Sequence, residues 1–491
     1  KIARLTFLDP ACGCGNFLVV AYRELRLLEL EVIEQIQKDS TQLIMDVSAL
    51  IRCNVNQFYG IEIEEFPSQI ARVAMWLVDH QMNLLVSDRF GMHYARIPLK
   101  RSAAILNANA LQTDWPVTDY ILGNPPFIGS KLIDKNQRVA FDGVMSVVPK
   151  SGVLDFVSAW YVKAAQLIKA NADIRCALVS TNSITQGEQV GILWGWIFFF
   201  FLCIQFAHRT FQWQSAATGK AAVHCVIIGF GTDNTLNKTI FDYEEGKGLP
   251  IPISANNINA YLVDAANVFL ENRTKPICQV PIIGIGNKPI DGGNYLFTEA
   301  EKVAFIKQEP LAEKYFRVWL GADEFINNYQ RHCLWLGDVS PSDLRKMPNS
   351  MKRIEAVKQL RLASSSAPTQ KLAATPTRFH VENFPKSNYL LVPRVSSEKR
   401  LYLPVGFIKA DASTSASAII SHKANLFDFG IMTSIMHNAW MRAVCGRLES
   451  RYRYSVGIVY NNFPWPLNPS DKQKQTIGAA AQAVLDARAT H

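Results

Sequence analysis

The sequence lacks a run of apolar residues long enough to cross a membrane. The best candidate, residues 191–204, has only 14 residues before the polar Gln205, and a spanning helix needs about 20. We expect this segment to be the end of a helix that runs into a buried strand. Residues 1–8 contain no long apolar region ahead of a cleavage site, so the sequence indicates neither a signal peptide nor a membrane partner.

The sequence also lacks cysteines paired at the spacing of a zinc site. Its nine cysteines are scattered, and Cys12 and Cys14, although close together, lie in a glycine-rich turn without a second pair. We therefore expect reduced thiols, no metal and a cytoplasmic protein.

A strong excess of charge of one sign is missing as well. The chain has 51 Lys and Arg residues against 42 Asp and Glu residues, which gives a net charge of +9. Such an excess fits a polyanionic partner, and it also fits a role in solubility alone. At 491 residues and 48% hydrophobic content, the chain is long enough for two or three domains with cores of their own.

Residues 1–230 alternate between strand-like and helix-like segments. The expected strands are residues 5–8, 58–63, 120–122, 176–179 and 222–230, and the expected helices are 17–37, 67–85 and 153–170. This alternation predicts an α/β domain whose mostly parallel sheet is covered by helices on both faces. In such a sheet, ligands bind at the carboxyl ends of the strands.

The pattern changes after about residue 275, where prolines, asparagines and short mixed segments replace the alternation. We expect a catalytic domain over residues 1–275, an α+β domain over 276–470 and a terminal helix over 471–491. Within the second domain, residues 363–377 are typical of an exposed flexible loop, and 389–395 and 400–405 are strand-like.

A glycine-rich loop follows the first expected strand and opens the first helix. Residues 9–17 read Asp-Pro-Ala-Cys-Gly-Cys-Gly-Asn-Phe, without the Gly-Lys-Ser/Thr of a phosphate loop or the third glycine of a dinucleotide fingerprint. The motif is typical of loops that hold S-adenosylmethionine, with Asp9 near the ammonium group of the ligand, directly or through water. The candidate cofactor-binding residues here are Asp9, Ala11, Gly13, Gly15 and Phe17.

Polar residues at the ends of the next two strands complete the candidate cofactor site. Glu62 ends the second strand, and a carboxylate at that place can accept both ribose hydroxyls. Glu64 is the alternative if the strand continues, and both can instead be solvated acids. Asn109 is a candidate for the adenine edge of the cofactor, although a turn asparagine is nearly as good an interpretation.

The tetrapeptide Asn124-Pro125-Pro126-Phe127 follows the strand at 120–122. An aromatic amine is a poor nucleophile, because its lone pair is delocalised into the ring. The Asn124 side-chain oxygen and the Pro125 carbonyl can hold its two hydrogens and aim the lone pair at a methyl sulfonium, while Phe127 stacks on the base. A proline turn without chemistry is the alternative, but the glycine loop upstream favours catalysis.

A base in a duplex has to be flipped out to reach such a pocket. Phe211 and Trp213, near the strand at 222–230, are weak candidates for another wall of the base pocket.

The second half of the chain carries three clusters of cations, which can contact phosphates or guanine edges. The first is Lys352, Arg353, Lys358 and Arg361, the second Arg394, Lys399 and Arg400, and the third Arg442, Arg447, Arg451 and Arg453 with Tyr452 and Tyr454. Any one cluster can be an ordinary solvated face, but together they favour DNA.

These motifs, in this order, resemble amino-methylating DNA methyltransferases of the gamma arrangement. The whole chain is similar to the methyltransferase and target-recognition portion of MmeI-like (type IIL) restriction–modification enzymes. The supporting stretches are residues 9–17, 123–128, 219–230, 286–294, 447–454 and 460–466. The resemblance implies a Rossmann-like class I S-adenosylmethionine-dependent methyltransferase sheet and a C-terminal α+β recognition domain. It also implies a site-specific DNA adenine-N6 methyltransferase with double-stranded DNA as its partner.

Two departures from the family pattern bear on this interpretation. Cys14 stands where the familiar loop has serine, and only eight residues precede the loop, so the segment that covers the cofactor is missing from this sequence. No convincing Asp…Glu-x-Lys nuclease motif is visible. The sequence is therefore either a fragment or the product of a gene without the nuclease, and it leaves open a nuclease domain upstream in the same polypeptide or on a separate protein. The alternatives are a protein-glutamine or RNA methyltransferase, or a DNA-binding specificity subunit with an idle methylase.

Overall fold

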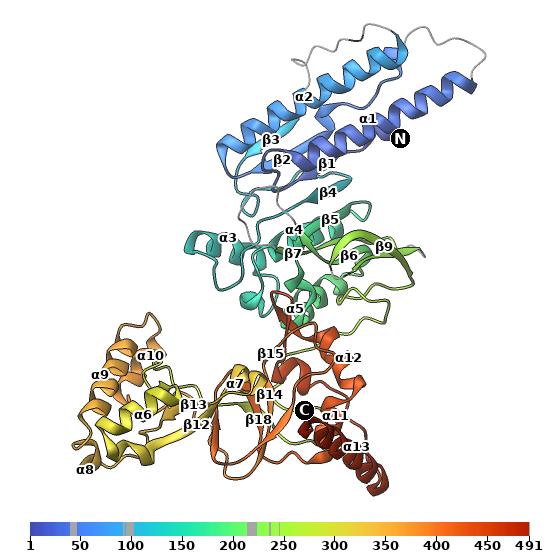
Figure 1. The fold of residues 1–491 in the computed structure, drawn as a ribbon. Helices are drawn as coiled ribbons and strands as arrows, with labels where there is room; N and C mark the ends of the chain where they lie inside the picture. Colours follow the sequence, from blue (N-terminus) through green and yellow to red (C-terminus); the bar gives the residue numbers. More distant parts are fainter. Residues whose placement is uncertain are drawn as a thin grey trace. The chain divides into compact units, whose positions relative to one another are not determined.

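The computed structural model describes residues 1–39, 47–91, 94, 103–213, 223–234, 237–244 and 246–490. The chain divides into two compact units, Lys1–Leu270 and Glu271–His491, and each is described by itself (Figure 1).

Unit 1 is an α/β domain. Its helices are α1 (Asn16–Asp39), α2 (Glu65–Phe90), α3 (Lys135–Met145), α4 (Ser158–Ala170) and α5 (Gly187–Phe199). Its strands are β1 (Phe7–Asp9), β2 (Phe58–Glu62), β3 (Ala104–Asn107), β4 (Tyr120–Gly123), β5 (Arg175–Thr181), β6 (Cys203–Trp213), β7 (Val223–Gly231), β8 (Lys238–Glu244) and β9 (Lys247–Ala255).

The nine strands form one sheet in the order β3-β2-β1-β4-β5-β7-β6-β8-β9. Strands β1 to β5 are parallel to one another, whereas β7 runs antiparallel to both β5 and β6. The expected Rossmann-like sheet with a mostly parallel first half is thus confirmed. The order in which the strands are added to the sheet reverses at β1, which has β2 on one side and β4 on the other. A ligand should therefore bind at this place.

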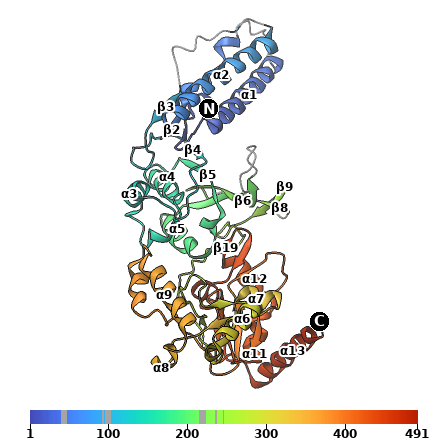
Figure 2. The same cartoon turned by 60° about the vertical axis from the view of Figure 1, so that its left-hand side comes forward.

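The two faces of the sheet carry separate cores. Neighbouring residues of β1 point to opposite faces: Phe7 packs with α1 and α2, and Leu8 packs with α4 and α5. Helices α1 and α2 run side by side in both views (Figure 1, Figure 2). Between them the fully buried Arg26 donates hydrogen bonds to the Tyr22 hydroxyl (3.0 Å) and to Asn83 (3.4 Å).

The apolar segment at 191–204 belongs to two elements, as expected. Helix α5 ends at Phe199, and β6 begins at Cys203 and enters the sheet. In the described part of the chain, no helix combines the length and the apolar character that crossing a membrane requires. Residues 219–222 of the family-like stretch 219–230 lie outside the described residues.

Unit 2 has an α+β fold with three small sheets, ordered β10-β18-β14-β16, β11-β13-β12-β17 and β15-β20-β19. The strands are β10 (Gly284–Ile285), β11 (Leu296–Phe297), β12 (Phe316–Leu320), β13 (Arg331–Leu334), β14 (Tyr389–Pro393), β15 (Val395–Ser396), β16 (Gly406–Ile408), β17 (Ala412–Thr414), β18 (Ala418–Ser421), β19 (Gly446–Leu448) and β20 (Arg451–Arg453). The helices are α6 (Glu299–Gln308), α7 (Ala322–Asn327), α8 (Pro341–Leu344), α9 (Pro348–Leu362), α10 (Ala367–Lys371), α11 (Leu426–Thr433), α12 (Ile435–Val444) and α13 (Asp471–Ala489).

The beginning of unit 2 is bound to residues near its end. The Asn462 amide donates to the carbonyl of Glu271 (2.9 Å), and the Asn461 amide donates to that of Arg273 (2.7 Å). The Tyr460 hydroxyl donates to the Pro281 carbonyl (2.6 Å). The Tyr-Asn-Asn segment noted in the sequence therefore closes this unit on itself.

Two expectations for unit 2 are wrong. Residues 363–377 are not simply an exposed loop, because they contain α10 and a 3-10 turn at Leu372–Ala374. Residues 400–405 form no strand, and the neighbouring strand β16 begins only at Gly406. Residues 400–405 are held by distant side chains, which local patterns do not reveal: Arg442 donates to the Leu401 carbonyl, and the Leu403 N–H donates to Asn438 Oδ1.

The first cation cluster also differs from its expected role in DNA binding. Arg361 is fully buried and donates hydrogen bonds to five backbone carbonyls, those of Pro289, Ile290, Leu372, Thr375 and Arg378. Its neighbour Arg353 lies 4.1 Å from the centre of the Phe297 ring. These two arginines therefore hold unit 2 together, and Arg361 cannot reach DNA.

Candidate functional site

A cavity of about 690 Å³ lies at the carboxyl ends of the strands of unit 1, where ligands bind in such folds. Its walls come from the loops that follow β1, β2, β3 and β4, together with α3 and α4. The lining residues are Pro10, Ala11, Ile61, Glu62, Ile63, Ala108, Asn109, Ala110, Gln112, Asn124, Pro126, Ile128, Asn136, Gln137, Val139, Phe156 and Trp160.

The cavity brings together candidate residues from four separate segments of the sequence. Ala11, Glu62, Asn109, Asn124 and Pro126 all line it. Glu64 does not, because β2 ends at Glu62 and the next turn takes Glu64 to the start of α2. Of the two carboxylates considered for the ribose, the structure thus places Glu62 at the cavity.

Glu62 joins the glycine loop to the second strand. Its Oε2 accepts a hydrogen bond from the Gly13 backbone N–H (2.8 Å), and its Oε1 accepts one from the Glu64 backbone N–H (3.0 Å). Each carboxylate oxygen can accept a second hydrogen bond. Glu62 therefore orients the loop and keeps acceptor capacity for a ligand.

The glycine loop is held tightly against the rest of unit 1. Gly13 and Gly15 have positive φ angles of 53° and 85°, a conformation that glycine adopts without strain. A Cβ atom on Gly15 would lie 3.1 Å from the Cβ of Ala71 in α2. Neither glycine lines the cavity, and neither does Phe17, which is half-buried in the first turn of α1.

Asp9 lies at the end of β1, behind the cavity wall. Its carboxylate is buried, with Oδ1 accepting from the Ala11 N–H (3.0 Å) and Oδ2 lacking a hydrogen-bond partner in the described part of the chain. Burial raises the pKa of Asp9 to about 7, the Ala11 N–H opposes this, and the charge of Glu62 adds to it. A cation placed beside Oδ2 would favour the ionised form.

The Asn124 tetrapeptide directly follows β4. The Asn124 side-chain Oδ1 is buried without a hydrogen-bond partner among the described residues, although the residue lines the cavity. Pro125 is buried, whereas Pro126 is exposed at the cavity. Phe127 is half-buried and packs against the core formed with α4 and α5. The tetrapeptide thus presents an unused acceptor at a site large enough for a small molecule.

The loop after β3 gives Asn109 two roles at once. Its side-chain Oδ1 accepts from the Leu111 N–H (3.0 Å), as in a turn, and the residue also lines the cavity. Both interpretations of Asn109 are therefore compatible with its position.

Helices α3 and α4 contribute wall residues that the sequence did not single out. Asn136 and Val139 come from α3, Phe156 lies just before α4, and Trp160 lies in the first turn of α4. The Trp160 indole donates to the Pro10 carbonyl (3.1 Å) and so ties α4 to the glycine loop. The sequence could have indicated these wall residues by their position, because the segments that follow the tetrapeptide cover the edge of the sheet where ligands bind.

Phe211 and Trp213, the weak candidates for the base pocket, do not line this cavity. They lie at the end of β6 in an aromatic cluster, with ring centres 6.1 Å apart and the Tyr243 ring 5.1 Å from Phe211. The His208 ring, 4.3 Å from Phe241, extends the cluster.

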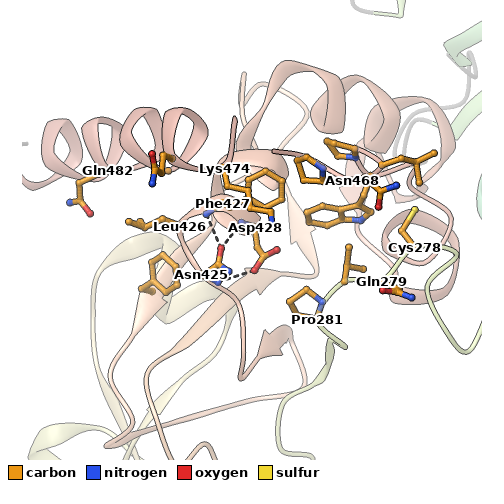
Figure 3. Close-up of a pocket in the computed structure, with 18 of the residues that line it drawn as sticks. Cys278, Gln279, Pro281, Asn425, Leu426, Phe427, Asp428, Asn468, Lys474 and Gln482 are labelled. Carbon is orange, nitrogen blue, oxygen red and sulfur yellow. Dashed lines mark hydrogen bonds between the residues drawn. The ribbon is translucent and has the colours of Figure 1, made fainter. Parts of the chain in front are cut away.

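A larger cavity, of about 1480 Å³, lies in unit 2 and contains none of the candidate catalytic residues. It is bordered by the segment at Cys278–Pro281, the start of α11 and one side of α13 (Figure 3). Asn425 caps α11 there by accepting from the N–H groups of Phe427 and Asp428. Its lining offers no group suited to methyl transfer.

The second and third cation clusters meet on the sheet β15-β20-β19, which we call the arginine sheet (Val395–Ser396, Arg451–Arg453 and Gly446–Leu448). Val395 pairs with Arg453, and Arg447 pairs with Tyr452. Arg451 and Arg453 share one face, because alternate residues of a strand point the same way. Both are exposed, as are Lys399 and Arg400.

Four arginines of these clusters make contacts within the protein. Arg442 donates to the carbonyls of Arg400 and Leu401, and the exposed Arg451 pairs with Glu449 (2.8 Å). Arg447 lies 4.5 Å from the centre of the Tyr452 ring and donates to the Ser450 carbonyl. Arg394 is half-buried and donates to the Ala416 carbonyl (3.2 Å). Burial, together with the charge of Arg453, lowers the pKa of Arg394.

We expect Gly123→Ala to lower the melting temperature of the protein by several degrees. A Cβ atom at Gly123 would lie 2.4 Å from Oδ1 of the buried Asp9, and overpacking of this kind costs about 1–3 kcal/mol. Gly143→Ala is the matched control. No atom lies within 4 Å of the added Cβ in α3, and alanine favours a helix. Equal melting temperatures in calorimetry would contradict the close approach of Gly123 to Asp9.

Comparison with known proteins agrees with the two units. Residues 1–242 match the family model of the MmeI DNA-methyltransferase domain, and residues 264–467 match that of the MmeI target recognition domain. DNA methyltransferase A of Bacillus subtilis (strain 168) is 38% identical to this chain. The alignment is 501 residues long, gaps included, and it covers 99% of this chain and 55% of that protein.

Among solved structures, the type IIL restriction–modification enzyme MmeI in complex with DNA is 51% identical and superimposes with a TM-score of 0.94. The match covers 100% of this chain and 66% of that one. The chain thus spans about half to two thirds of the length of these relatives. It belongs to the MmeI family, and it carries the DNA-methyltransferase domain of that family followed by the target recognition domain.

Proposed function

We propose that this chain is a site-specific DNA adenine-N6 methyltransferase, which transfers a methyl group from S-adenosyl-L-methionine to a flipped-out adenine. The observation that carries the proposal is the buried Asn124 Oδ1, an acceptor without a partner in the described structure, at the wall of the cavity. An unsatisfied buried acceptor costs about 1–3 kcal/mol, and an amino group of a substrate would satisfy it.

Membership of a DNA-methyltransferase family implies a methyl donor, and the residues of the cavity fit S-adenosyl-L-methionine. The volume of about 690 Å³ is typical of a small-molecule site. Glu62 has acceptor capacity for the ribose hydroxyls, and the unpartnered Asp9 Oδ2 suits an ammonium group, directly or through water. We assign Ala11, Gly13, Gly15, Phe17 and Asn109 to the same site through the loops that they build.

The chain's own contribution to methyl transfer is positioning. Asn124 Oδ1 and the Pro125 carbonyl each accept a hydrogen bond from the N6 amino group of adenine. These two bonds turn the nitrogen lone pair out of the ring plane toward the methyl group. The S-adenosyl-L-methionine sulfonium supplies that methyl group when bound. The methylated nitrogen then releases one proton to water, and no strong general base is needed. Pro126 fixes the backbone, and Phe127 stacks on the base.

The arginine sheet and the nearby Lys399 and Arg400 are the proposed DNA contacts of unit 2. Their exposed cations can neutralise phosphates or bond guanine edges. The MmeI relative is a restriction–modification enzyme in complex with DNA. We propose that this chain is likewise the modification and recognition part of a restriction–modification system, with the nuclease on the same polypeptide or on a separate protein.

The test of the proposed function is incubation with labelled S-adenosyl-L-methionine and mixed-sequence double-stranded DNA, followed by nucleoside analysis. We expect label in N6-methyladenine. Label in N4-methylcytosine would correct the target base, and label in RNA or in protein glutamine offered in parallel would favour the other methyltransferase classes. Binding of cofactor and DNA without transfer would identify an idle methylase that serves as a specificity subunit.

Alanine variants of the cations should separate DNA contacts from structural roles. At Lys399, Arg400, Arg451 and Arg453, loss of a phosphate contact should weaken binding to all sequences and flatten the salt dependence by about one unit of slope. Loss of a base contact should cost roughly 1–3 kcal/mol at one position of the site. At Arg394 and Arg447 we expect lower thermal stability in addition. Arg394 donates to the Ala416 carbonyl, and Arg447 donates to the Ser450 carbonyl in the turn between β19 and β20.

Fluorescence anisotropy at several salt concentrations and sequencing of methylated sites measure these effects. Arg345→Ala is the control, because this exposed arginine lies outside the arginine sheet. If all six variants kept wild-type affinity, salt slope and site choice, the recognition surface would lie elsewhere.

A further inference from the structure

The loop that follows the Asn124 tetrapeptide is fastened to the protein by one carboxylate, that of Asp155. Its Oδ1 accepts a hydrogen bond from the Ser130 backbone N–H (2.9 Å), and its Oδ2 accepts one from the Ser183 hydroxyl (2.5 Å). Ser130 lies three residues after Phe127, and Ser183 lies just past the end of β5. Asp155 thus bridges the catalytic loop and the neighbouring strand of the sheet.

The backbone around Asp155 adds to this bridge. The Phe156 N–H donates to the Ile128 carbonyl (2.9 Å), so the segment 128–130 is held at two points by residues 155–156. The Asp155 N–H donates in turn to the Gln189 side chain in α5 (3.1 Å). Both Ile128 and Phe156 line the cavity, which places the bridge next to the proposed site of methyl transfer.

Asn124 itself shows why such a bridge matters. Its Oδ1 has no hydrogen-bond partner in the described residues, so within that part of the chain no side-chain contact fixes its acceptor. The position of the tetrapeptide then depends on its two flanks. On one side β4 holds it in the sheet. On the other side, residues 128–130 are held by Asp155 and Phe156, and Arg138 of α3 adds a hydrogen bond to the Ser130 carbonyl (2.8 Å).

We propose that Asp155 is a positioning residue for methyl transfer, which holds the Asn124 tetrapeptide in register with the cavity without touching the substrate. This inference rests on the proposed function of the cavity. It assigns a role in catalysis to a residue that is remote in sequence from both the glycine loop and the tetrapeptide. Because misplacement of a reacting group by about 1 Å can cost a hundredfold in rate, loss of the bridge should appear in the rate of the transfer step.

The experiment compares Asp155→Ala with Asp155→Asn in single-turnover methylation of DNA. Asp155→Ala should lower the rate constant roughly 10- to 100-fold and leave the KM values for S-adenosyl-L-methionine and DNA nearly unchanged. Asp155→Asn should restore most of the rate, because its amide oxygen can accept from Ser130 and its NH₂ can donate to the Ser183 oxygen. Asp173→Ala, in the exposed turn before β5, is the matched control and should behave as wild type.

A second measurement does not depend on activity. Hydrogen exchange of the peptide that covers residues 124–133 should become at least several-fold faster in Asp155→Ala, with wild-type exchange in Asp155→Asn and in peptides of β1 and β2. If Asp155→Ala fails to fold, Ser183→Ala should show the same pattern with a smaller effect. It removes the bond to Asp155 Oδ2 together with the contact between the Ser183 and Thr181 hydroxyls (2.8 Å).

The outcomes separate this inference from the function on which it rests. Wild-type exchange over 124–133, or a rate within twofold of wild type, in Asp155→Ala overturns the positioning role while the proposed methyltransferase stands. If the wild-type protein transferred no methyl group to DNA, the proposed function would fail, and the exchange data would still decide whether Asp155 fastens the loop. Equal loss of rate in the alanine and asparagine variants also overturns the proposal.

Discussion

Replacing Asn124 by alanine is expected to slow methyl transfer to DNA by about a hundredfold or more, with cofactor binding close to normal. The structure gives the reason: Asn124 Oδ1 is the buried, unpartnered acceptor at the cavity wall. Loss of one preorganised polar contact to the reacting group commonly costs on the order of 100- to 1000-fold in rate. The cofactor contacts assigned to Asp9 and Glu62 come from other strands and should be unaffected.

Single-turnover methylation and calorimetric titration with S-adenosyl-L-methionine separate the two effects. Asn124→Asp keeps an acceptor oxygen at the same place and should retain more activity than Asn124→Ala. Asn171→Ala, at the end of α4, is the control for a lost asparagine away from the cavity. Near-normal turnover in Asn124→Ala would remove the catalytic role assigned to this residue.

Affinity for S-adenosyl-L-methionine is expected to fall about tenfold for each pH unit below about 7. Burial raises the pKa of Asp9 to about 7 in the ligand-free protein, so below that pH the carboxyl group is protonated and cannot balance an ammonium group. Binding near pH 6 must then release a proton. Titration calorimetry in two buffers of different ionisation enthalpy measures that proton directly.

In the ligand-free protein, the raised pKa of Asp9 should make the free energy of unfolding depend on pH. The pKa of Asp9 is 3.8 in its ordinary state and about 7 in the folded protein, so between these values the folded state binds more protons than the unfolded state. The stabilisation of the folded state by the protonated Asp9 carboxyl group is therefore fully present below pH 3.8, and it is lost as the pH rises through 7. Asp9→Asn should abolish both effects, and Asp173→Asn should abolish neither. Affinity that stayed constant from pH 5.5 to 7 in the wild type would refute the role of Asp9.

Much of unit 1 could be predicted because its strands and helices have strong, local patterns. The helices expected at 17–37 and 67–85 correspond to α1 and α2, and the strands expected near residues 5, 58, 120 and 176 correspond to β1, β2, β4 and β5. Their order in a parallel sheet follows general rules. The meeting of Glu62, Asn109 and Asn124 at one cavity follows from that order.

The remaining features depend on contacts between distant residues. Arg361 has the local sequence of a surface helix. Its burial depends on the carbonyl groups of two other segments, residues 289–290 and 372–378. The role of Asp155 is equally invisible in the sequence, because its partners Ser130 and Ser183 are 25 and 28 residues away. Short strands such as β15 and β19 carry too few residues for a pattern.

The bonds between Glu271–Pro281 and Tyr460–Asn462 have a consequence for how recognition can be changed. Because these hydrogen bonds join the first residues of unit 2 to residues 460–462, we expect a replacement of this unit to fold best when it includes both segments. A transplanted unit that includes both residues 271–281 and residues 460–462 keeps these hydrogen bonds, so its two ends need not be redesigned for each new recognition domain. Exchanges whose boundaries lie between residues 281 and 460 separate these partners, and they should yield less folded protein than exchanges whose boundaries lie outside this range.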